Sequence, residues 1–171
     1  MGRICKLMLV ITALLCASVV SAGAAVADSS NTVTVHVHST SKTITPNTVV
    51  DCVATVPNPY QIVAGAARPW YTESYVSSCS VPPPDSCSIV VSLDELVNDE
   101  SGNQSWQNRQ EGNQTSVAPC KINLKSMTSG YKCLSTLTDH EFKASVIFSI
   151  FWNGQVAVGV KDSNTVTIPC E

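Results

Sequence analysis

Apolar and polar residues alternate along several segments of this chain, and a period of two is typical of half-buried β-strands. The longest such segment, "FKASVIFSIFW" at 142–152, places every second side chain from Phe142 to Trp152 on one face. Asn153-Gly154 then separates it from "QVAVGV", and Asn-Gly between alternating segments is a strong hairpin signal. Shorter segments of the same kind are "NTVTVHVHS", "CSIVVSL", "CKINL" and "NTVTIPC". The sequence therefore predicts an all-β, antiparallel protein.

One acidic segment, "SLDELVNDE" at 92–100, has a weak 3.6-residue period. Because it is acidic and Gly102 follows it, we expect the end of a strand and a solvated loop there, not a helix. Residues 98–114 are polar and contain glycine, which indicates a long loop or an edge hairpin.

The N-terminal segment has the features of a secretory leader. Arg3 and Lys6 precede an apolar run from Leu7 to Val20, and Ala25-Val26-Ala27 forms an A-x-A cleavage site. We therefore expect a signal peptide at 1–27 and a secreted mature chain at 28–171, with no membrane span. Two lipid anchors fit less well, one on Cys16 as in a bacterial lipobox and one on Gly2 by myristoylation.

The mature chain is acidic. The leader removes two of ten basic residues and none of the thirteen acidic ones, which leaves eight against thirteen and a net charge of −5. No basic cluster remains, so nucleic acid and anionic membrane surfaces are poor partners. The length suits a single domain.

Six cysteines remain after the leader: Cys52, Cys79, Cys87, Cys120, Cys133 and Cys170. An even number in a secreted chain predicts three disulfides, and the wide spacings without a C-x-x-C pair argue against a zinc site. We expect the pairs Cys52–Cys79, around a Pro-Tyr loop, Cys87–Cys133, between the two sheets, and Cys120–Cys170, at the C-terminal strand. The alternative joins Cys120 to Cys133 and Cys87 to Cys170.

Four residues are spaced through the second half of the chain in a characteristic order: Cys87, Trp106, Tyr131 and Cys133. They resemble the immunoglobulin-like pattern, in which a Trp packs on a disulfide between the sheets and a Tyr two residues before the second Cys forms a corner. The resemblance implies a disulfide-stapled antiparallel β-sandwich of immunoglobulin-like topology. It also implies that the Tyr131 hydroxyl bonds a backbone group a few residues upstream. Met127 and Ser129 depart from the corner motif, so a Tyr that packs locally beside a disulfide is the alternative.

A second resemblance covers about 52–170. Its features are Cys52 before a Pro-containing loop, Cys79-Ser80 before an alternating strand, Gly130-Tyr131, the Asn153-Gly154 hairpin and a last strand that ends in Cys170. This order resembles small secreted β-sandwich proteins of actinobacteria, most of which have no known activity. Such proteins commonly carry four cysteines, so the resemblance implies that Cys87 and Cys133 are an additional pair. It implies no catalytic residues.

Histidines provide one candidate site. His36 and His38 lie two residues apart in an alternating segment and project to the same face, as two metal ligands do. His140, in "TDHEF", is the third histidine of the chain. The alternative is an edge strand that turns polar side chains to water, and we expect no cofactor.

Aromatic residues provide another candidate. In "RPWYTESYV" at 68–76, Trp70 lies on one strand face, while Tyr71 and Tyr75 lie on the other. If one face belongs to the core, the opposite face exposes aromatic rings, which binding surfaces favour. The alternative is that both faces are packed.

Nothing in the sequence favours an enzyme. There is no G-x-S-x-G motif, and solvation explains the carboxylate pairs Asp94/Glu95 and Asp99/Glu100. We expect a secreted, non-catalytic module that binds an extracellular protein or a surface component. One alternative is an inhibitor of an extracellular hydrolase that presents a braced loop such as 81–86, and another is a metalloprotein. Asn103 and Asn113 begin N-glycosylation sequons.

Overall fold

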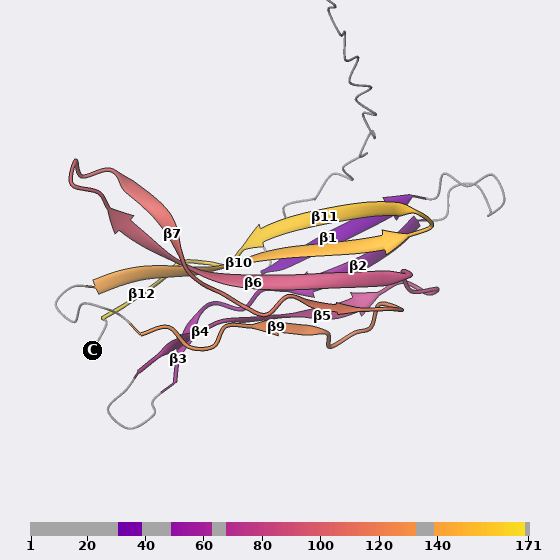
Figure 1. Cartoon of the computed structure of the whole chain (residues 1–171), viewed down its shortest axis with the longest axis horizontal. Coiled ribbons are helices and arrows are strands. Elements are labelled where there is room, and N and C mark those ends of the chain that lie inside the picture. Colours follow the sequence, from indigo (N-terminus) through magenta and orange to yellow (C-terminus); the bar gives the residue numbers. More distant parts are fainter. Residues whose placement is uncertain (1–30, 39–48, 63–67, 133–138, 170–171) are drawn as a thin grey trace, which may run out of the picture.

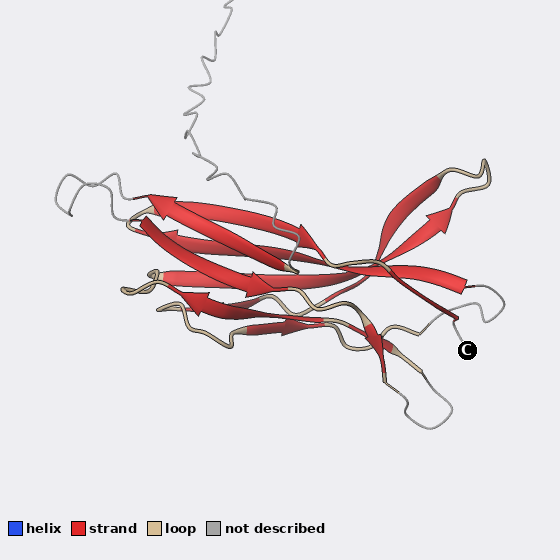
Figure 2. Cartoon of the chain, turned by 180° about the vertical axis from the view of Figure 1, so that it is seen from behind, coloured by secondary structure: helices blue, strands red, loops and turns tan. Residues whose placement is uncertain are grey.

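The computed structural model describes residues 31–38, 49–62, 68–132 and 139–169. These residues form two antiparallel sheets that face each other, as Figures 1 and 2 show. The four-stranded sheet has the order β1-β2-β5-β9, with β1 at Thr32–His38, β2 at Val49–Thr55, β5 at Glu73–Cys79 and β9 at Lys125–Met127. The all-β, antiparallel prediction is confirmed.

The second sheet has six strands. Its main order is β11-β10-β6-β7, with β6 at Ser86–Asn98, β7 at Gln104–Glu111, β10 at Asp139–Trp152 and β11 at Gln155–Asp162. Two short strands complete it, since β8 at Thr115–Val117 pairs with β6 and β12 at Val166–Pro169 pairs with β10. A separate pair consists of β3 at Tyr60–Gln61 and β4 at Trp70–Tyr71. Among the described residues, no helix is long and apolar enough to cross a membrane.

The core lies between the two sheets and follows the alternation of the sequence. The inward residues of β10 run from Phe142 to Trp152, and those of β1 are Val33, Val35 and Val37; all are buried. Gly159 of β11 faces Val33 and Val35, whose Cγ2 atoms would lie 2.6 and 2.7 Å from an added Cβ. Because only a glycine allows this approach, β1 packs closely under β11.

The hairpin between β10 and β11 has the predicted turn. Asn153 and Gly154 have φ angles of 49° and 77°, and two consecutive positive φ angles are typical of a type I′ turn. Trp152 and Gln155 close the hairpin as direct partners, and the register continues without a shift to Ser145 and Asp162. This turn therefore sets the register of the whole β10–β11 pair.

A second, smaller core lies at the end of the molecule where β10 and β6 extend past the four-stranded sheet. Trp70, Leu93 and Phe142 are fully buried there. The Trp70 and Phe142 ring centroids lie 4.5 Å apart, and Tyr131 forms an isolated bridge with Trp70. Trp70 is thus a core residue, so it is not part of an exposed binding surface.

The disulfides correct part of the predicted pairing. Cys52 is bonded to Cys79, which confirms one expected pair, and Cys87 is bonded to Cys120. The expected pairs Cys87–Cys133 and Cys120–Cys170 are therefore wrong, and so is the alternative scheme. The reason is β8: it lies beside the start of β6, where Val117 pairs with Cys87, so the next few residues bring Cys120 to Cys87. Cys133 and Cys170 lie outside the described residues.

Two further expectations from the immunoglobulin-like pattern are also wrong. Trp106 lies on β7 opposite Leu96, far along β6 from Cys87, and its side chain is partly exposed beneath the Lys143 ammonium. The Tyr131 hydroxyl contacts the side chain of Glu95, not an upstream backbone group.

One short predicted strand is absent. Residues 121–124 of "CKINL" form a turn, with Asn123 at φ 65° and Ile122 exposed. The backbone returns to the four-stranded sheet through this turn, and the Asn123 amide donates to the Val76 carbonyl at 2.7 Å. Three alternating positions are too few to distinguish a strand from a turn that happens to bury its ends.

Candidate functional site

The residues Ser80–Asp85, which we name the braced loop, connect the two sheets. The loop lies between Cys79 and Cys87, and each of these cysteines is in a disulfide. Val81 at its start is 95% exposed, more than any other large apolar side chain among the described residues. Three prolines follow Val81 in the sequence, so few conformations are open to this loop.

Hydrogen bonds hold the braced loop to three neighbouring segments. The Ser80 amide donates to the Asp51 carbonyl of β2 at 2.8 Å, and the Cys120 amide donates to the Pro84 carbonyl at 3.1 Å. The Asn153 amide, in the β10–β11 turn, donates to Asp85 Oδ2 at 2.8 Å. The loop is therefore held at both of its ends, at Ser80 and at Pro84–Asp85, while Val81 projects into solvent.

The two disulfides beneath the loop lie against each other. Cys120 Sγ is 3.6 Å from Cys79 Sγ and 3.9 Å from Cys52 Sγ. These three residues are the only group of three or more possible metal ligands that the described part of the chain brings together. Because their sulfurs are all in disulfides, they are not thiolate ligands. The disulfides are consistent with an oxidising, extracellular setting.

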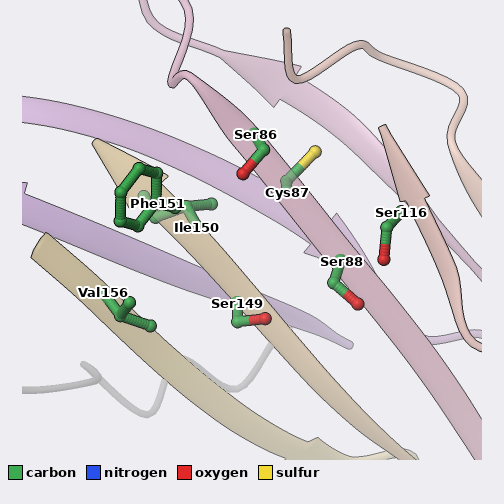
Figure 3. A pocket seen from close by; sticks show the side chains of 8 residues that line it. All are labelled: Ser86, Cys87, Ser88, Ser116, Ser149, Ile150, Phe151 and Val156. Atoms are coloured by element: carbon green, nitrogen blue, oxygen red, sulfur yellow. The ribbon is translucent and has the colours of Figure 1, made fainter. Parts of the chain in front are cut away.

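A shallow pocket of about 210 Å³ opens beside the loop, on the outer face of the six-stranded sheet. Figure 3 shows its side chains, which come from four neighbouring strands: Ser86, Cys87, Ser88, Ser116, Ser149, Ile150, Phe151 and Val156. Serine hydroxyls make up its centre, and the Phe151 ring and Val156 make up one wall. The pocket offers apolar contact together with several groups that can donate and accept hydrogen bonds.

The outer face continues as an apolar band over β10 and β11. We give this name to Ile147, Phe151, Val156, Val158 and Val160, whose exposed fractions range from 39 to 60%. They are neighbours because Ile147 pairs with Val160 and Phe151 pairs with Val156 in the β10–β11 register. A contiguous group of large apolar side chains on a surface marks an interaction site more often than scattered ones do.

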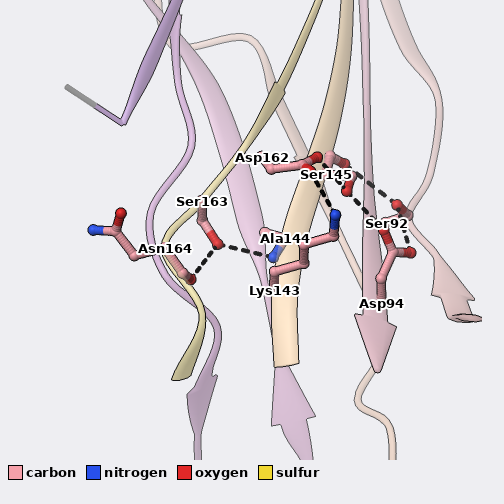
Figure 4. A network of polar contacts seen from close by, with 8 residues as sticks. All are labelled: Ser92, Asp94, Lys143, Ala144, Ser145, Asp162, Ser163 and Asn164. Carbon is pink, nitrogen blue, oxygen red and sulfur yellow. Dashed lines mark hydrogen bonds and ion pairs between the residues drawn. The ribbon is translucent and has the colours of Figure 1, made fainter. Parts of the chain in front are cut away.

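A polar network limits the apolar band at its far end (Figure 4). The Ser145 hydroxyl lies 2.6 Å from Asp94 Oδ2 and 2.7 Å from Asp162 Oδ1, and Lys143 Nζ lies 2.5 Å from Asp162 Oδ2. Burial alone raises the pKa of Asp162, but the hydrogen bonds from Lys143 and Ser145 outweigh it and lower that pKa below its ordinary value. Asp162, whose side chain is 46% exposed, therefore stays charged at neutral pH beside the apolar band.

Glu95 forms a second polar cluster, at the inner face of β6. The carboxylate is buried, Arg109 Nε lies 2.5 Å from its Oε2, and His140 Nδ1 contacts its Oε1. The Tyr131 hydroxyl also contacts it, and burial together with the negative charge of Glu95 raises the pKa of Tyr131. The expectation that solvation explains Glu95 is wrong. The signal was present, because Glu95 continues the inward face that runs from Cys87 to Leu93.

The structure separates the three histidines. His36 and His38 lie on β1 and turn away from the core, whereas His140 contacts Glu95. His140 therefore does not complete a site with the other two, and metal binding by His36 and His38 alone stays a prediction.

The aromatic candidates divide as the alternation predicted. Trp70 is fully buried, while Tyr71 and Tyr75 are half-buried on the opposite face. The Tyr71 ring stacks on Tyr60 with centroids 6.2 Å apart, and Lys125 Nζ lies 6.0 Å from the centre of the Tyr75 ring. Both tyrosines have neighbours within the chain, and binding through them stays a prediction.

Comparison with protein-family models, with curated proteins and with solved structures found no significant match to this chain. The described residues define an all-β fold with antiparallel sheets packed together, and they contain two disulfides. The resemblance to actinobacterial sandwich proteins stays a prediction.

Proposed function

We propose that this protein is a secreted, non-catalytic binding module that contacts an extracellular protein or surface component through its braced loop. The observation that carries the proposal is Val81, which is 95% exposed on a loop whose two ends are held by disulfides. An apolar side chain in this position has no role in the core. Full burial of this side chain by a partner would contribute about 1.5–3 kcal/mol of favourable free energy to binding.

The rigidity of the loop supports a binding role. A flexible loop loses conformational freedom when it binds, and this loss opposes association. The prolines, the disulfides and the bonds from Cys120 and Asn153 have already removed most of that freedom here. The serine-lined pocket begins at Ser86, directly after the braced loop, and adds hydrogen-bonding groups for a partner that reaches past the loop.

The test is affinity capture of extracellular proteins from the source organism or its host on the immobilised protein. We expect a component that binds the wild type and is lost with Val81→Asp. The matched control is Val49→Asp, because Val49 is also exposed but lies on β2 of the four-stranded sheet. This variant should still bind the component. Equal capture by the wild type and Val81→Asp would contradict a binding role for the loop.

The same geometry favours a second candidate, an inhibitor of an extracellular endopeptidase. A projecting, braced loop can enter a substrate cleft, with Val81 in a small apolar pocket and a Val81-Pro82 bond behind it. Peptide bonds before proline are poor substrates for most endopeptidases, so such a loop would remain intact. This candidate predicts inhibition of a protease that prefers valine, with a large rise in the inhibition constant for Val81→Asp and none for Val49→Asp.

We propose an immunoglobulin-like strand order for only one of the two sheets. The order β11-β10-β6-β7 corresponds to strands G, F, C and C′ of an immunoglobulin domain. In the four-stranded sheet, however, the neighbour of β2 is β5, which precedes β6 in the chain. The corresponding immunoglobulin neighbour, strand E, comes after strand C. We therefore infer that the likeness extends to one sheet.

A further inference from the structure

Strand β11 is the edge of the six-stranded sheet. It pairs with β10 over its whole length, and among the described residues no other strand pairs with its second side. Figure 1 shows β11 as the outermost strand of this sheet. An unpaired strand edge is a template for a further strand, and soluble proteins usually protect it with charges, prolines or bulges. From Val156 to Val160 β11 has none of these.

The edge of the other sheet shows the contrast. Strand β1 turns Thr34, His36 and His38 away from the core, side chains that suit water. Strand β11 turns Val156, Val158 and Val160 outward, and their exposed fractions are 49, 49 and 60%. Both strands bury their inward side chains, so the difference between the two edges lies in the outward residues alone.

The sequence of β11 around Val158 reads almost the same in both directions, as Val-Ala-Val-Gly-Val at 156–160. In an antiparallel pair of two such strands centred on Val158, each outward valine lies opposite a valine. Val156 faces Val160 of the partner subunit, and Val158 faces Val158 of the partner subunit. A two-fold interface requires such a self-complementary surface, and β-branched cross-strand pairs stabilise a sheet.

We propose that β11 pairs with β11 of a second copy of this chain, about a two-fold axis at Val158, so that two six-stranded sheets become one continuous sheet. The inward residues permit this without rearrangement, because Ala157 is buried and Gly159 is already packed on Val33 and Val35. Ile147 and Phe151 extend the apolar band from β11 onto β10. The joined strands place the apolar bands of both copies side by side.

Cysteine cross-linking tests the pairing and its register. Under mild oxidation Val158→Cys should form a covalent dimer that reductant separates, because the residue lies opposite its own copy. Val156→Cys and Val160→Cys should cross-link when mixed, and neither should do so alone. The matched control is Val49→Cys, exposed on β2, which should stay monomeric on a non-reducing gel, as the wild type should.

Light scattering of the wild type gives an independent measurement. We expect about twice the monomer mass, a shift to monomer with Val158→Asp, and no shift with Val49→Asp. The proposal would be overturned if the wild type stays monomeric at every concentration and Val158→Cys forms no cross-link. The β11 edge would then be available to a strand of a different protein. Cross-linking by Val156→Cys alone would also overturn it, because it excludes the axis at Val158. If Val158→Asp fails to fold, the cross-linking result decides.

Discussion

Glu95 is a carboxylate at an inward position of β6, and three side chains surround it. An ionised carboxylate without partners is very costly to bury. Arg109, His140 and the Tyr131 hydroxyl compensate for that cost here, and Arg109 and His140 keep part of their surface in solvent. The cluster closes the polar end of the small core around Trp70 and Phe142. Its inward orientation follows from the alternation of β6. Its partners depend on how other segments lie against β6, because Arg109 is on β7, His140 is on β10 and Tyr131 lies between β9 and β10, and no local pattern contains that arrangement.

At the scale of single residues we predict that Arg109→Met destabilises the protein by about 1–3 kcal/mol, because the buried Glu95 carboxylate loses the guanidinium that lies 2.5 Å from its Oε2. The matched control is Lys125→Met, which removes an exposed cation 4.0 Å from Glu73. An exposed pair of this kind contributes about 0–1 kcal/mol. Urea unfolding of both variants measures the difference. Equal costs for the two substitutions would show that burial of Glu95 does not strengthen the pair.

At the scale of elements, the length of an alternating segment decides whether the sequence predicts a strand correctly. The alternation of β10 covers its whole inward face, and the adjoining Asn153-Gly154 turn leaves one register, so both were predictable. The segment "CKINL" offers only three alternating positions and is a turn. The polar segment 98–114 was open between a loop and an edge hairpin, and β7 shows the hairpin. The segment has no apolar–polar alternation that would indicate a strand, so only its observed pairing with β6 decides that case.

The close contact of β11 with β1 leads to the second prediction. Gly159→Ala should destabilise the protein by about 1–3 kcal/mol, because the added Cβ would lie 2.6 and 2.7 Å from methyl carbons of Val33 and Val35 in a packed core. The control is Val160→Ile on the outward face of the same strand, where a substitution changes stability by about 0.5 kcal/mol or less. Thermal melts at low protein concentration compare the two. A Gly159→Ala variant as stable as the wild type would mean that β1 moves freely away from β11.

At the scale of the whole molecule, the sequence predicted two facing sheets but only one of the observed cysteine pairs. The Cys52–Cys79 bond joins adjacent strands, β2 and β5, which hold these residues directly opposite each other. The Cys87–Cys120 bond depends on β8 lying beside β6, and a segment of three residues gives almost no strand signal. The positions of the longer strands do not contain this contact, and the predicted partners of Cys87 and Cys120 are wrong for that reason.

The last prediction rests on the proposed secretion and concerns Cys133 and Cys170, the two cysteines after the expected leader for which the described residues show no bond. Because an even number of cysteines in a secreted chain is usually fully paired, and Cys87 and Cys120 are bonded to each other, we expect a third disulfide, Cys133–Cys170. Peptide mapping of the unreduced protein should recover the two cysteines in one linked peptide. Replacing both by serine should lower the free energy of unfolding by about 2–5 kcal/mol, because the unfolded chain gains the freedom that the bond removes. Alkylation of Cys133 and Cys170 in the unreduced, denatured protein would contradict this pairing, since it would show two free thiols.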